Sequence, residues 1–307
     1  MGVTGNEGMP STSGPDDELA AAIDHALDAL LAALQLEPVG DDRFRVEADL
    51  GRFAQVFGGQ VLAQAIVAAS ATVEGKDPHS LHAYFVEAGI PGEALEVEVD
   101  RVRDGRSFAT RRVSVHQGDR ELLTAIASFH ANPEGLELVT PAPTAPAPDE
   151  LPLLQAWAAD PVPERTELGR GWIDRPPPIE MRMTEGPSFL GRPHGEGPRS
   201  HWMRLPRPVG DDPVLHAALL AYASDFFLLD MSFRARPSDV NPLDLTGISL
   251  DHSIWFHRPV RFDRWHLYTH EAVAVSGHRG LVRGSIHDEA GHLVASAAQE
   301  TLVRPAR

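Results

Sequence analysis

The chain has 307 residues, of which 42% are hydrophobic and 23% are charged, which is typical of a folded protein and excludes disordered, collagen-like and coiled-coil chains. Its formal net charge is −17, from 44 acidic and 27 basic residues, so nucleic acid and anionic membranes are not expected partners. No cysteine is present, which excludes disulfides, iron–sulfur sites and thiol catalysis. No apolar run predicts membrane insertion and no signal-peptide pattern opens the chain, so we expect a cytoplasmic protein.

The first predicted unit is an N-terminal tail followed by an amphipathic helix, over residues 1–41. Residues 1–15 are polar and predicted to be disordered. A helix is expected from Pro15, because three acidic residues occupy its first turn, where negative charge suits the helix dipole, and leucines follow at helical spacing.

The second predicted unit, residues 42–133, is a sheet wrapped around one helix. A strand is expected over 44–50. The stretch 57–73 is apolar nearly all round, and a helix without a polar face must be buried on all sides. Strand-like runs separated by turn signals follow, which favours an antiparallel sheet curled around that helix. These runs cover 80–88, 94–103, 107–117 and 120–130.

A proline-rich linker over 134–170 is predicted to separate the first sheet from a second copy of the same plan, residues 171–307. The stretch 175–200 is expected to be irregular. A second apolar helix is expected over 214–230, and the simplest account of the chain is an α+β fold of two helix-in-sheet repeats. The strands of the second copy are expected over 249–258, 265–277, 281–288 and 292–303.

Several catalytic signatures are absent. The chain has no nucleophile elbow of a serine hydrolase, no zinc-protease motif, no Walker loop and no dinucleotide-binding glycine motif. Its fifteen histidines mostly stand singly on predicted strands, so we expect no metal site.

Three polar residues in apolar stretches of the second half are the strongest candidates for chemistry. Asp225 ends an apolar helix-like run, Ser249 begins a strand, and Gln299 interrupts a strand of small apolar residues. Carboxylates are seldom buried unless they are paired or functional. Together the three could orient and deprotonate a water. The spacing alone equally permits Asp225 to cap the helix and Gln299 to face solvent.

Two further features permit ligand contacts. Gly58 and Gly59 open the first buried helix, so their backbone N–H groups could stabilise a carbonyl oxygen that gains negative charge, or the glycines could simply form a tight turn. The segment 101–112 carries five arginines and one aspartate in an otherwise acidic chain. It could bind an anionic group or form a solvated strand face.

Segments in both halves resemble the acyl-CoA thioesterase II family, in the family's order and over about residues 42–305. The resemblance implies a double hotdog fold and hydrolysis of acyl-CoA, such as medium- to long-chain fatty acyl-CoA, to free acid and CoA. It implies neither a metal nor a cofactor, since CoA is part of the substrate, and it makes a homo-oligomer the default. The segments are VFGGQVLAQA (56–65), HAYF (82–85), RDGRSFATRRV (103–113), TAIASF (124–129), YASD (222–225), DHSIWFHRP (251–259), GLVRG (280–284) and VASAAQE (294–300).

The resemblance also implies roles for individual residues. The family's water-activating Asp, Thr and Gln fall on Asp225, Ser249 and Gln299, so a serine replaces the threonine but keeps the hydroxyl. A basic, proline-containing turn of the family is replaced by VEAGIPG with Glu87. Five residues in the matching segments become candidate substrate contacts, the two arginines through the CoA phosphates: Gly58, Gly59, His82, Arg111 and Arg112.

Two other functions stay open from the sequence. A hotdog hydratase would need an Asp and a His close together, and Asp77 and His82 have suggestive spacing but straddle Pro78. An acyl-CoA-binding protein without turnover would fit the serine replacement and the altered loop. The preference for Arg over Lys and the abundance of Ala are typical of a GC-rich bacterial genome.

Overall fold

The computed structural model describes residues 15–47, 53–131, 135–138 and 140–306, so the predicted disorder of residues 1–15 falls almost wholly outside the described residues. Each half of this part has a central helix and a set of antiparallel strands. The first half comprises α1 (Pro15–Ala33), β1 (Glu37–Gly40), β2 (Arg43–Val46), α2 (Gly58–Ser70), β3 (Asp77–Phe85), β4 (Leu95–Asp104), β5 (Phe108–Gln117) and β6 (Arg120–His130).

The second half begins with short helices and ends with long strands. Its helices and 3₁₀ turns are η1 (Pro148–Glu150), α3 (Leu154–Ala158), η2 (Pro163–Arg165), α4 (Thr166–Asp174), η3 (Ser188–Leu190), α5 (Pro213–Ser224), α6 (Leu228–Arg234) and η4 (Pro242–Asp244). Its strands are β7 (Glu180–Met183), β8 (Arg199–Arg204), β9 (Leu245–Ser249), β10 (Asp251–Phe256), β11 (His266–Ser276), β12 (Arg279–Asp288) and β13 (Leu293–Pro305).

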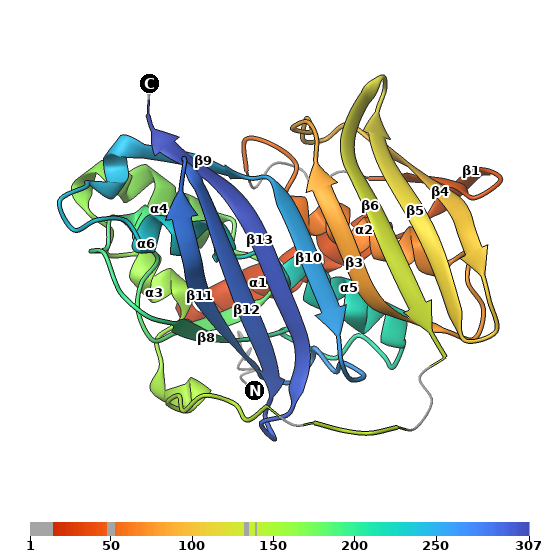
Figure 1. Ribbon diagram of the computed structural model, residues 1–307. Coiled ribbons are helices and arrows are strands. Elements are labelled where there is room, and N and C mark those ends of the chain that lie inside the picture. The colour runs from red at the N-terminus through yellow and green to blue at the C-terminus, as the bar shows by residue number, and fades with distance from the viewer. Residues whose placement is uncertain (1–14, 48–52, 132–134, 139, 307) are drawn as a thin grey trace, which may run out of the picture.

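The strands of the described residues form one continuous antiparallel sheet, in the order β1-β2-β4-β5-β6-β3-β10-β13-β12-β11-β8-β7, with β9 also paired to β13. The two halves meet where β3 pairs with β10, with His82 opposite Ser253. In Figure 1 the two halves lie side by side, and α2 and α5 cover the same face of the sheet. This junction therefore brings the two central helices into contact with each other.

The first central helix is buried as its apolar composition predicts. Ten of the thirteen residues of α2 are buried, including Gln60 and Gln64. These glutamines donate hydrogen bonds to the backbone oxygen of Glu47 at 3.1 and 2.7 Å, and Gln64 also donates to that of Ala33 at 2.8 Å. Because these amides bond to backbone oxygens of the preceding segment, they tie α2 to α1 and to the end of β2.

The second central helix differs from its prediction, because the expected helix over 214–230 is broken. α5 ends at Ser224, and α6 starts only at Leu228. Phe227 between them adopts a left-handed backbone conformation with φ of +68°, which a continuous helix does not allow. The hydrophobic pattern is uninterrupted across the break and therefore gives no signal of it.

The segment predicted as a linker, 134–170, is only partly a spacer. From Pro148 onward it contains two 3₁₀ turns, α3 and the start of α4. Leu154 and Ala158 belong to the hydrophobic core. Two prolines of this segment, Pro148 and Pro163, occupy the first positions of η1 and η2, where the missing N–H costs nothing. The stretch 175–200, predicted to be irregular, contains β7 and η3.

The stretch Pro213–Arg234 is long and apolar enough to cross a membrane by composition, contrary to the expectation from the sequence. In the described structure 78% of its most apolar window is buried inside the protein, and the stretch comprises the two helices α5 and α6. Its apolar side chains are therefore explained by burial in the protein core.

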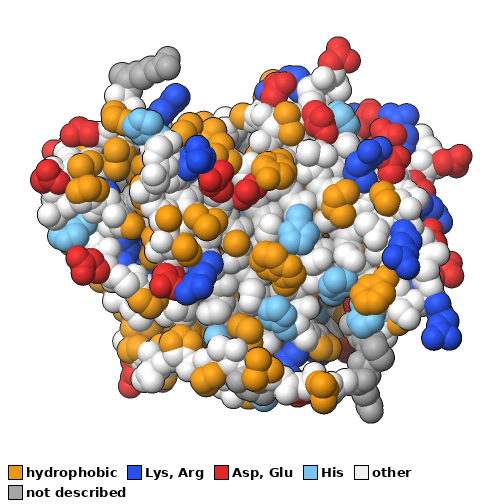
Figure 2. All heavy atoms as spheres, in the orientation of Figure 1, with side chains coloured by type: hydrophobic (Ala, Val, Ile, Leu, Met, Phe, Trp, Pro, Cys, Tyr) orange, Lys and Arg blue, Asp and Glu red, His pale blue; other side chains and the backbone are white. Residues whose placement is uncertain are grey.

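The outer face of the sheet carries exposed apolar and aromatic side chains beside histidines (Figure 2). Tyr84 and Ile126 are 64% and 41% exposed. The His82 ring packs edge-on against Trp255, and its Nδ1 lies 3.0 Å from Ser253 Oγ. This face is therefore less polar than a typical solvated sheet face.

Candidate active site

The carboxylate of Asp225 lies where the two halves meet, directly after the last residue of α5. It faces the start of α2, and the backbone N–H of Gly59 donates a hydrogen bond to it. A side chain at Gly58 would place its Cβ 2.8 Å from Asp225 Oδ2, and one at Gly59 would collide with the backbone oxygen of Tyr222. The two glycines therefore allow the start of α2 to approach Asp225 closely.

Gln299 and Ser249 reach the same place from neighbouring strands. Gln299 Nε2 donates a hydrogen bond of 2.6 Å to Asp225 Oδ1. Ser249 ends β9 opposite Thr301 of β13, two residues beyond Gln299, and lines the same pocket as Asp225. The structure therefore brings all three candidate catalytic residues together. Gln299 is completely buried and contacts the carboxylate, whereas Ser249 and Asp225 face the pocket.

Burial sets the acidity of Asp225. Loss of solvent raises the pKa of this carboxyl to about 6, although the hydrogen bonds from Gln299 and Gly59 act in the opposite direction. The group is thus ionised at neutral pH but holds a proton far more readily than an exposed aspartate. These are the properties of a general base that works near neutrality.

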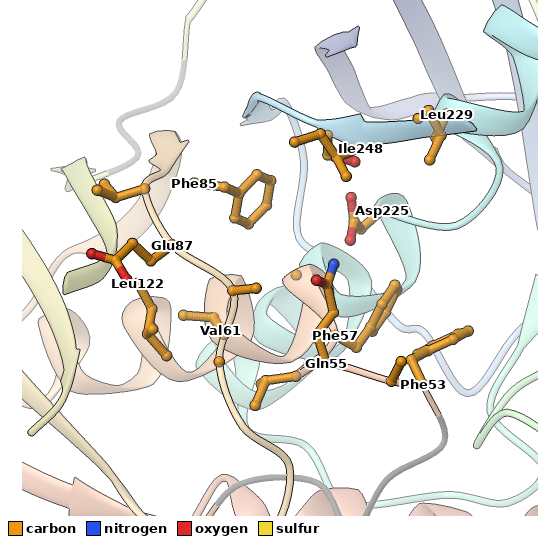
Figure 3. Close-up of a pocket in the computed structure, with 18 residues that line it drawn as sticks. Phe53, Gln55, Phe57, Val61, Phe85, Glu87, Leu122, Asp225, Leu229 and Ile248 are labelled. Atoms are coloured by element: carbon orange, nitrogen blue, oxygen red, sulfur yellow. The ribbon is translucent and has the colours of Figure 1, made fainter. Parts of the chain in front are cut away.

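The pocket beside Asp225 has a volume of about 430 Å³ and mostly apolar walls. In Figure 3 the Asp225 carboxylate points into it, with Phe85 on one side and Ile248 and Leu229 on the other. The remaining walls come from Phe53, Ala54, Gln55, Val56, Phe57, Gly58, Val61, Val86, Glu87, Ala88, Gly89, Leu122, Gly247 and Ser249. The segment 86–89, at which the sequence departs from the family pattern, therefore forms one wall.

Three of the predicted substrate contacts lie elsewhere. Arg111 is only 1% exposed, and its guanidinium donates to Thr72, Asp104 and backbone oxygens, which makes it a structural residue. Arg112 is exposed and pairs with Asp100 at 2.5 Å. Neither arginine, nor His82 on the outer face, lines the pocket. Strand alternation separates Arg111 from Arg112, and the sequence alone cannot say which face is the inner one.

Two residues near Asp225 were not among the predicted site residues. The side-chain amide of Gln55 points toward Asp225 in Figure 3. His252 is completely buried, with Nδ1 3.8 Å from Asp225 Oδ1. Gln55 directly precedes the VFGGQ segment, and His252 lies within the DHSIWF segment, so their place beside or in the family segments is the sequence signal that points to them. Among the described residues, no group of three or more His, Asp or Glu side chains could hold a metal ion.

Comparison with known proteins identifies the family. Models of the N-terminal and C-terminal acyl-CoA thioesterase domains match residues 46–130 and 148–303. The chain is 35% identical to human acyl-coenzyme A thioesterase 8 over 88% of this chain and 87% of that protein. It is 33% identical to acyl-CoA thioesterase 2 of Haemophilus influenzae over 91% and 98% of the two chains.

Solved structures agree with the family models. Acyl-CoA thioesterase II TesB2 from Mycobacterium marinum aligns with a TM-score of 0.72 at 33% identity, covering 91% of this chain and 98% of that one. A hot dog fold protein from Alicyclobacillus acidocaldarius aligns with a TM-score of 0.71 at 21% identity, over 91% and 99% of the chains, which bears on the fold alone. The predicted double hotdog is thus confirmed, and the chain belongs to the acyl-CoA thioesterase family.

Proposed function

We propose that Asp225 is the general base for acyl-CoA thioester hydrolysis, the reaction of this protein's family. One observation carries the proposal: a buried carboxylate with a pKa of about 6 faces an apolar pocket. Gln299 fixes one of its oxygens at 2.6 Å. The other oxygen, Oδ2, lies toward Gly58, which lines the pocket. This arrangement leaves one carboxylate oxygen to accept a proton from water.

The proposed reaction has two stages, addition of water to the thioester carbonyl and loss of CoA. Asp225 removes a proton from a water, whose oxygen attacks the thioester carbonyl carbon and forms a tetrahedral oxyanion. The C–S bond then breaks, the carbonyl re-forms, and CoA leaves as a thiolate that takes up the proton. The Ser249 hydroxyl, which lines the pocket, orients the water. None of these steps needs a metal or a cofactor.

The oxyanion requires hydrogen-bond donors near the start of α2. The N–H of Gly59 is already directed at Asp225. Gly58 lines the pocket and begins the helix, so its N–H and the positive end of the helix dipole suit a developing negative charge. We therefore assign the oxyanion contact to Gly58 and a positioning role to Gly59.

The acyl group is proposed to be a medium- to long-chain fatty acyl chain. The pocket of about 430 Å³ is nearly three times as large as an apolar cavity of about 150 Å³ that holds benzene. Its walls include three phenylalanines and several aliphatic side chains. Burial of each methylene in such walls is worth about 0.8 kcal/mol, which favours longer chains until the pocket is filled.

Release of free CoA from a series of acyl-CoAs tests the proposal, with a thiol-reactive dye as the readout. The protein contributes no thiol of its own, because it has no cysteine. Asp225→Asn should lower kcat by at least about a hundredfold. The variant should unfold no more easily than the wild type above pH 6, because ionisation of a carboxyl whose pKa is raised to about 6 destabilises the folded state.

Asp251→Asn is the matched control. Asp251 also has a pKa raised by burial, and it accepts a hydrogen bond of 2.7 Å from the Glu300 N–H, but it does not line the pocket. It should keep near-normal turnover. Undiminished turnover in Asp225→Asn would refute the assignment of the base. Saturable acyl-CoA binding by the wild type without CoA release would instead favour a binding protein.

A homo-oligomer in the cytoplasm is part of the same proposal. The apolar outer face of the sheet, with exposed Tyr84 and Ile126, suits contact with a second copy. A double change of both residues to aspartate should lower the mass measured by light scattering. An unchanged mass would exclude this face as the interface. The absence of cysteine supports the location.

A further inference from the structure

His252 extends from the inner face of β10 into the interior beside the Asp225–Gln299 pair. Its ring is 0% exposed. Nε2 lies 2.9 Å from Ser224 Oγ, and Nδ1 lies 3.4 Å from Gln299 Nε2. The reaction described above makes no use of this side chain, although it contacts both neighbours of the base, Ser224 in the chain and Gln299 in space.

The hydrogen bonds around His252 favour one tautomer of its ring. Ser224 Oγ donates to the backbone oxygen of Ala221 at 2.9 Å, so toward the imidazole it can only accept. In this arrangement Nε2 carries the hydrogen, which leaves Nδ1 as an acceptor. Gln299 Nε2 has two hydrogens, one for Asp225 Oδ1 and one for this Nδ1. The network runs from Ala221 through Ser224 and His252 to the amide, whose own oxygen is buried and has no hydrogen-bond partner among the described residues.

The imidazole stays neutral in this environment. Burial lowers the pKa of His252 to about 3. A protonated ring would carry hydrogens on both nitrogens and would oppose the Gln299 amide hydrogens. A second contact stiffens the other end of the network, because Tyr268 Oη donates to the backbone oxygen of Ser224 at 2.9 Å.

We propose that His252, held by Ser224, is a positioning residue that fixes the orientation of the Gln299 amide and thereby keeps Asp225 ready to act as a base. Without an acceptor at Nδ1, the amide is free to rotate by half a turn. Its oxygen would then face Asp225 Oδ1, and this contact is favourable only when the carboxyl is protonated. Loss of the acceptor should therefore raise the pKa of Asp225.

Other charges near the carboxylate are few in the described structure. Tyr268 of β11 and Glu87 at the pocket wall are the remaining titratable groups that face Asp225 or its pocket. Burial raises the pKa of Tyr268 well above its ordinary value, so it stays neutral at working pH. The acid limb of the pH–rate profile should therefore report mainly on Asp225.

Two amide variants distinguish the contributions of the two ring nitrogens of His252. The amide of asparagine reaches about as far as Nδ1, so His252→Asn can keep an acceptor for Gln299 while losing the contact to Ser224. The amide of glutamine reaches about as far as Nε2, so His252→Gln can keep the Ser224 contact while losing the acceptor. A role in packing alone would affect both variants alike.

The measurement is kcat/KM for one acyl-CoA as a function of pH, with thermal unfolding to show that each variant is folded. In His252→Gln the pKa that governs the acid limb should rise by about one pH unit. This shift corresponds to a tenfold loss of kcat/KM at pH values below that pKa and to little loss well above it. In His252→Asn the limb should stay near that of the wild type. The proposal would be overturned if the acid limb had the same pKa in the wild type and both variants, or if it shifted equally in His252→Gln and His252→Asn.

His257→Gln is the control, because Nε2 of His257 also lies 2.9 Å from a serine hydroxyl, that of Ser296, but on the exposed side of the sheet. It should leave the acid limb unchanged. If the His252 variants do not fold, ¹⁵N NMR of histidine in the wild type decides. Hydrogen on Nε2 and no titration between about pH 5 and 9 are expected. Hydrogen on Nδ1, or titration in that range, would overturn the proposal.

This inference rests on the proposed role of Asp225, but the two fail differently. An active Asp225→Asn variant refutes the base itself. An inactive Asp225→Asn variant together with an unshifted limb in His252→Gln refutes only the role of His252.

Discussion

The two halves of the molecule share one architecture but differ in what they bury. Among the described buried side chains of the first half, Arg111 is the one titratable group. The second half buries histidines, arginines and aspartates, including Arg199, His201, Asp225 and His270. The same helix-in-sheet framework therefore supports an apolar wall in one half and ionisable chemistry in the other, and the second half should be the more sensitive to pH.

The site itself belongs to neither half alone. The first half supplies the glycine-rich start of α2 and the walls at Phe85 and Leu122, and the second half supplies Asp225 and Ser249. The contact of α2 with α5 joins them. Changes that alter only one half should thus separate stability, catalysis and chain-length preference.

Acid sensitivity gives the largest expected difference between the halves. Burial lowers the pKa of His201 to about 3, and both ring nitrogens lack a hydrogen-bond partner among the described residues. The unfolded chain then binds the proton more tightly, so stability is lost as pH falls from about 6.5 toward 3, by up to about 5 kcal/mol. His201→Leu should unfold at lower pH than the wild type in acid titrations followed by circular dichroism.

His79→Leu in the first half provides the comparison. His79 is half-buried, its pKa is also lowered by burial, and its Nε2 bonds to Ser128. Its replacement should move the acid midpoint much less. A larger shift in His79→Leu than in His201→Leu would contradict the assignment of acid sensitivity to the second half.

The adjacent arginines of β5 test whether the first half binds CoA through them. Arg111→Leu removes a buried guanidinium that holds Thr72 and Asp104, and it should lower the free energy of unfolding by about 3–5 kcal/mol. Arg112→Leu removes only an exposed pair with Asp100, worth at most about 1 kcal/mol. Urea unfolding measures both changes in stability.

Because neither arginine lines the pocket, KM for acyl-CoA should stay unchanged in Arg112→Leu. A large increase in KM would restore its predicted role in binding CoA.

The close approach of the halves is tested at Gly59. Gly59→Ala places a methyl group against the Tyr222 backbone oxygen, which should force α2 away from α5 and cost about 1–3 kcal/mol of stability. Hydrolysis should fall as well, because the Gly59 N–H contacts Asp225. Gly171→Ala in α4 has open space around the added methyl group and should be neutral or slightly stabilising. Normal activity and stability in Gly59→Ala would show that the contact is not required.

The smallest expected effect concerns chain length. Leu122 of β6 lines the pocket, so Leu122→Trp should shorten the space for the acyl chain. Each excluded methylene is worth about 0.8 kcal/mol, or about fourfold in kcat/KM. Activity should fall for the longest acyl-CoAs and stay for the short ones. Ile126→Trp, at an exposed position of the same strand, should change neither. A uniform loss across all chain lengths would mean that Leu122 does not bound the acyl site.

Much of the fold was predictable because local patterns agree with the tertiary structure. The apolar run at 57–73 predicted a buried helix, and α2 covers Gly58–Ser70. The runs at 107–117 and 120–130 match β5 and β6 within one residue. Alternation and turn residues carry this information directly. The break after Ser224 was missed because a single left-handed residue, Phe227, leaves the hydrophobic pattern intact.

The sequence by itself determined the repeat, the family resemblance and the identity of Asp225, Ser249 and Gln299 as candidates, since these depend on residue type and order. Only the tertiary structure decided that Arg111 is structural, that Gln299 holds the carboxylate, and that His252 adjoins both. It also brought Gly58 and Asp225, which are 167 positions apart in the chain, into close proximity. The physical reason is that hydrogen-bond partners and burial arise from strand pairing and helix packing between distant segments, which local periodicity does not encode.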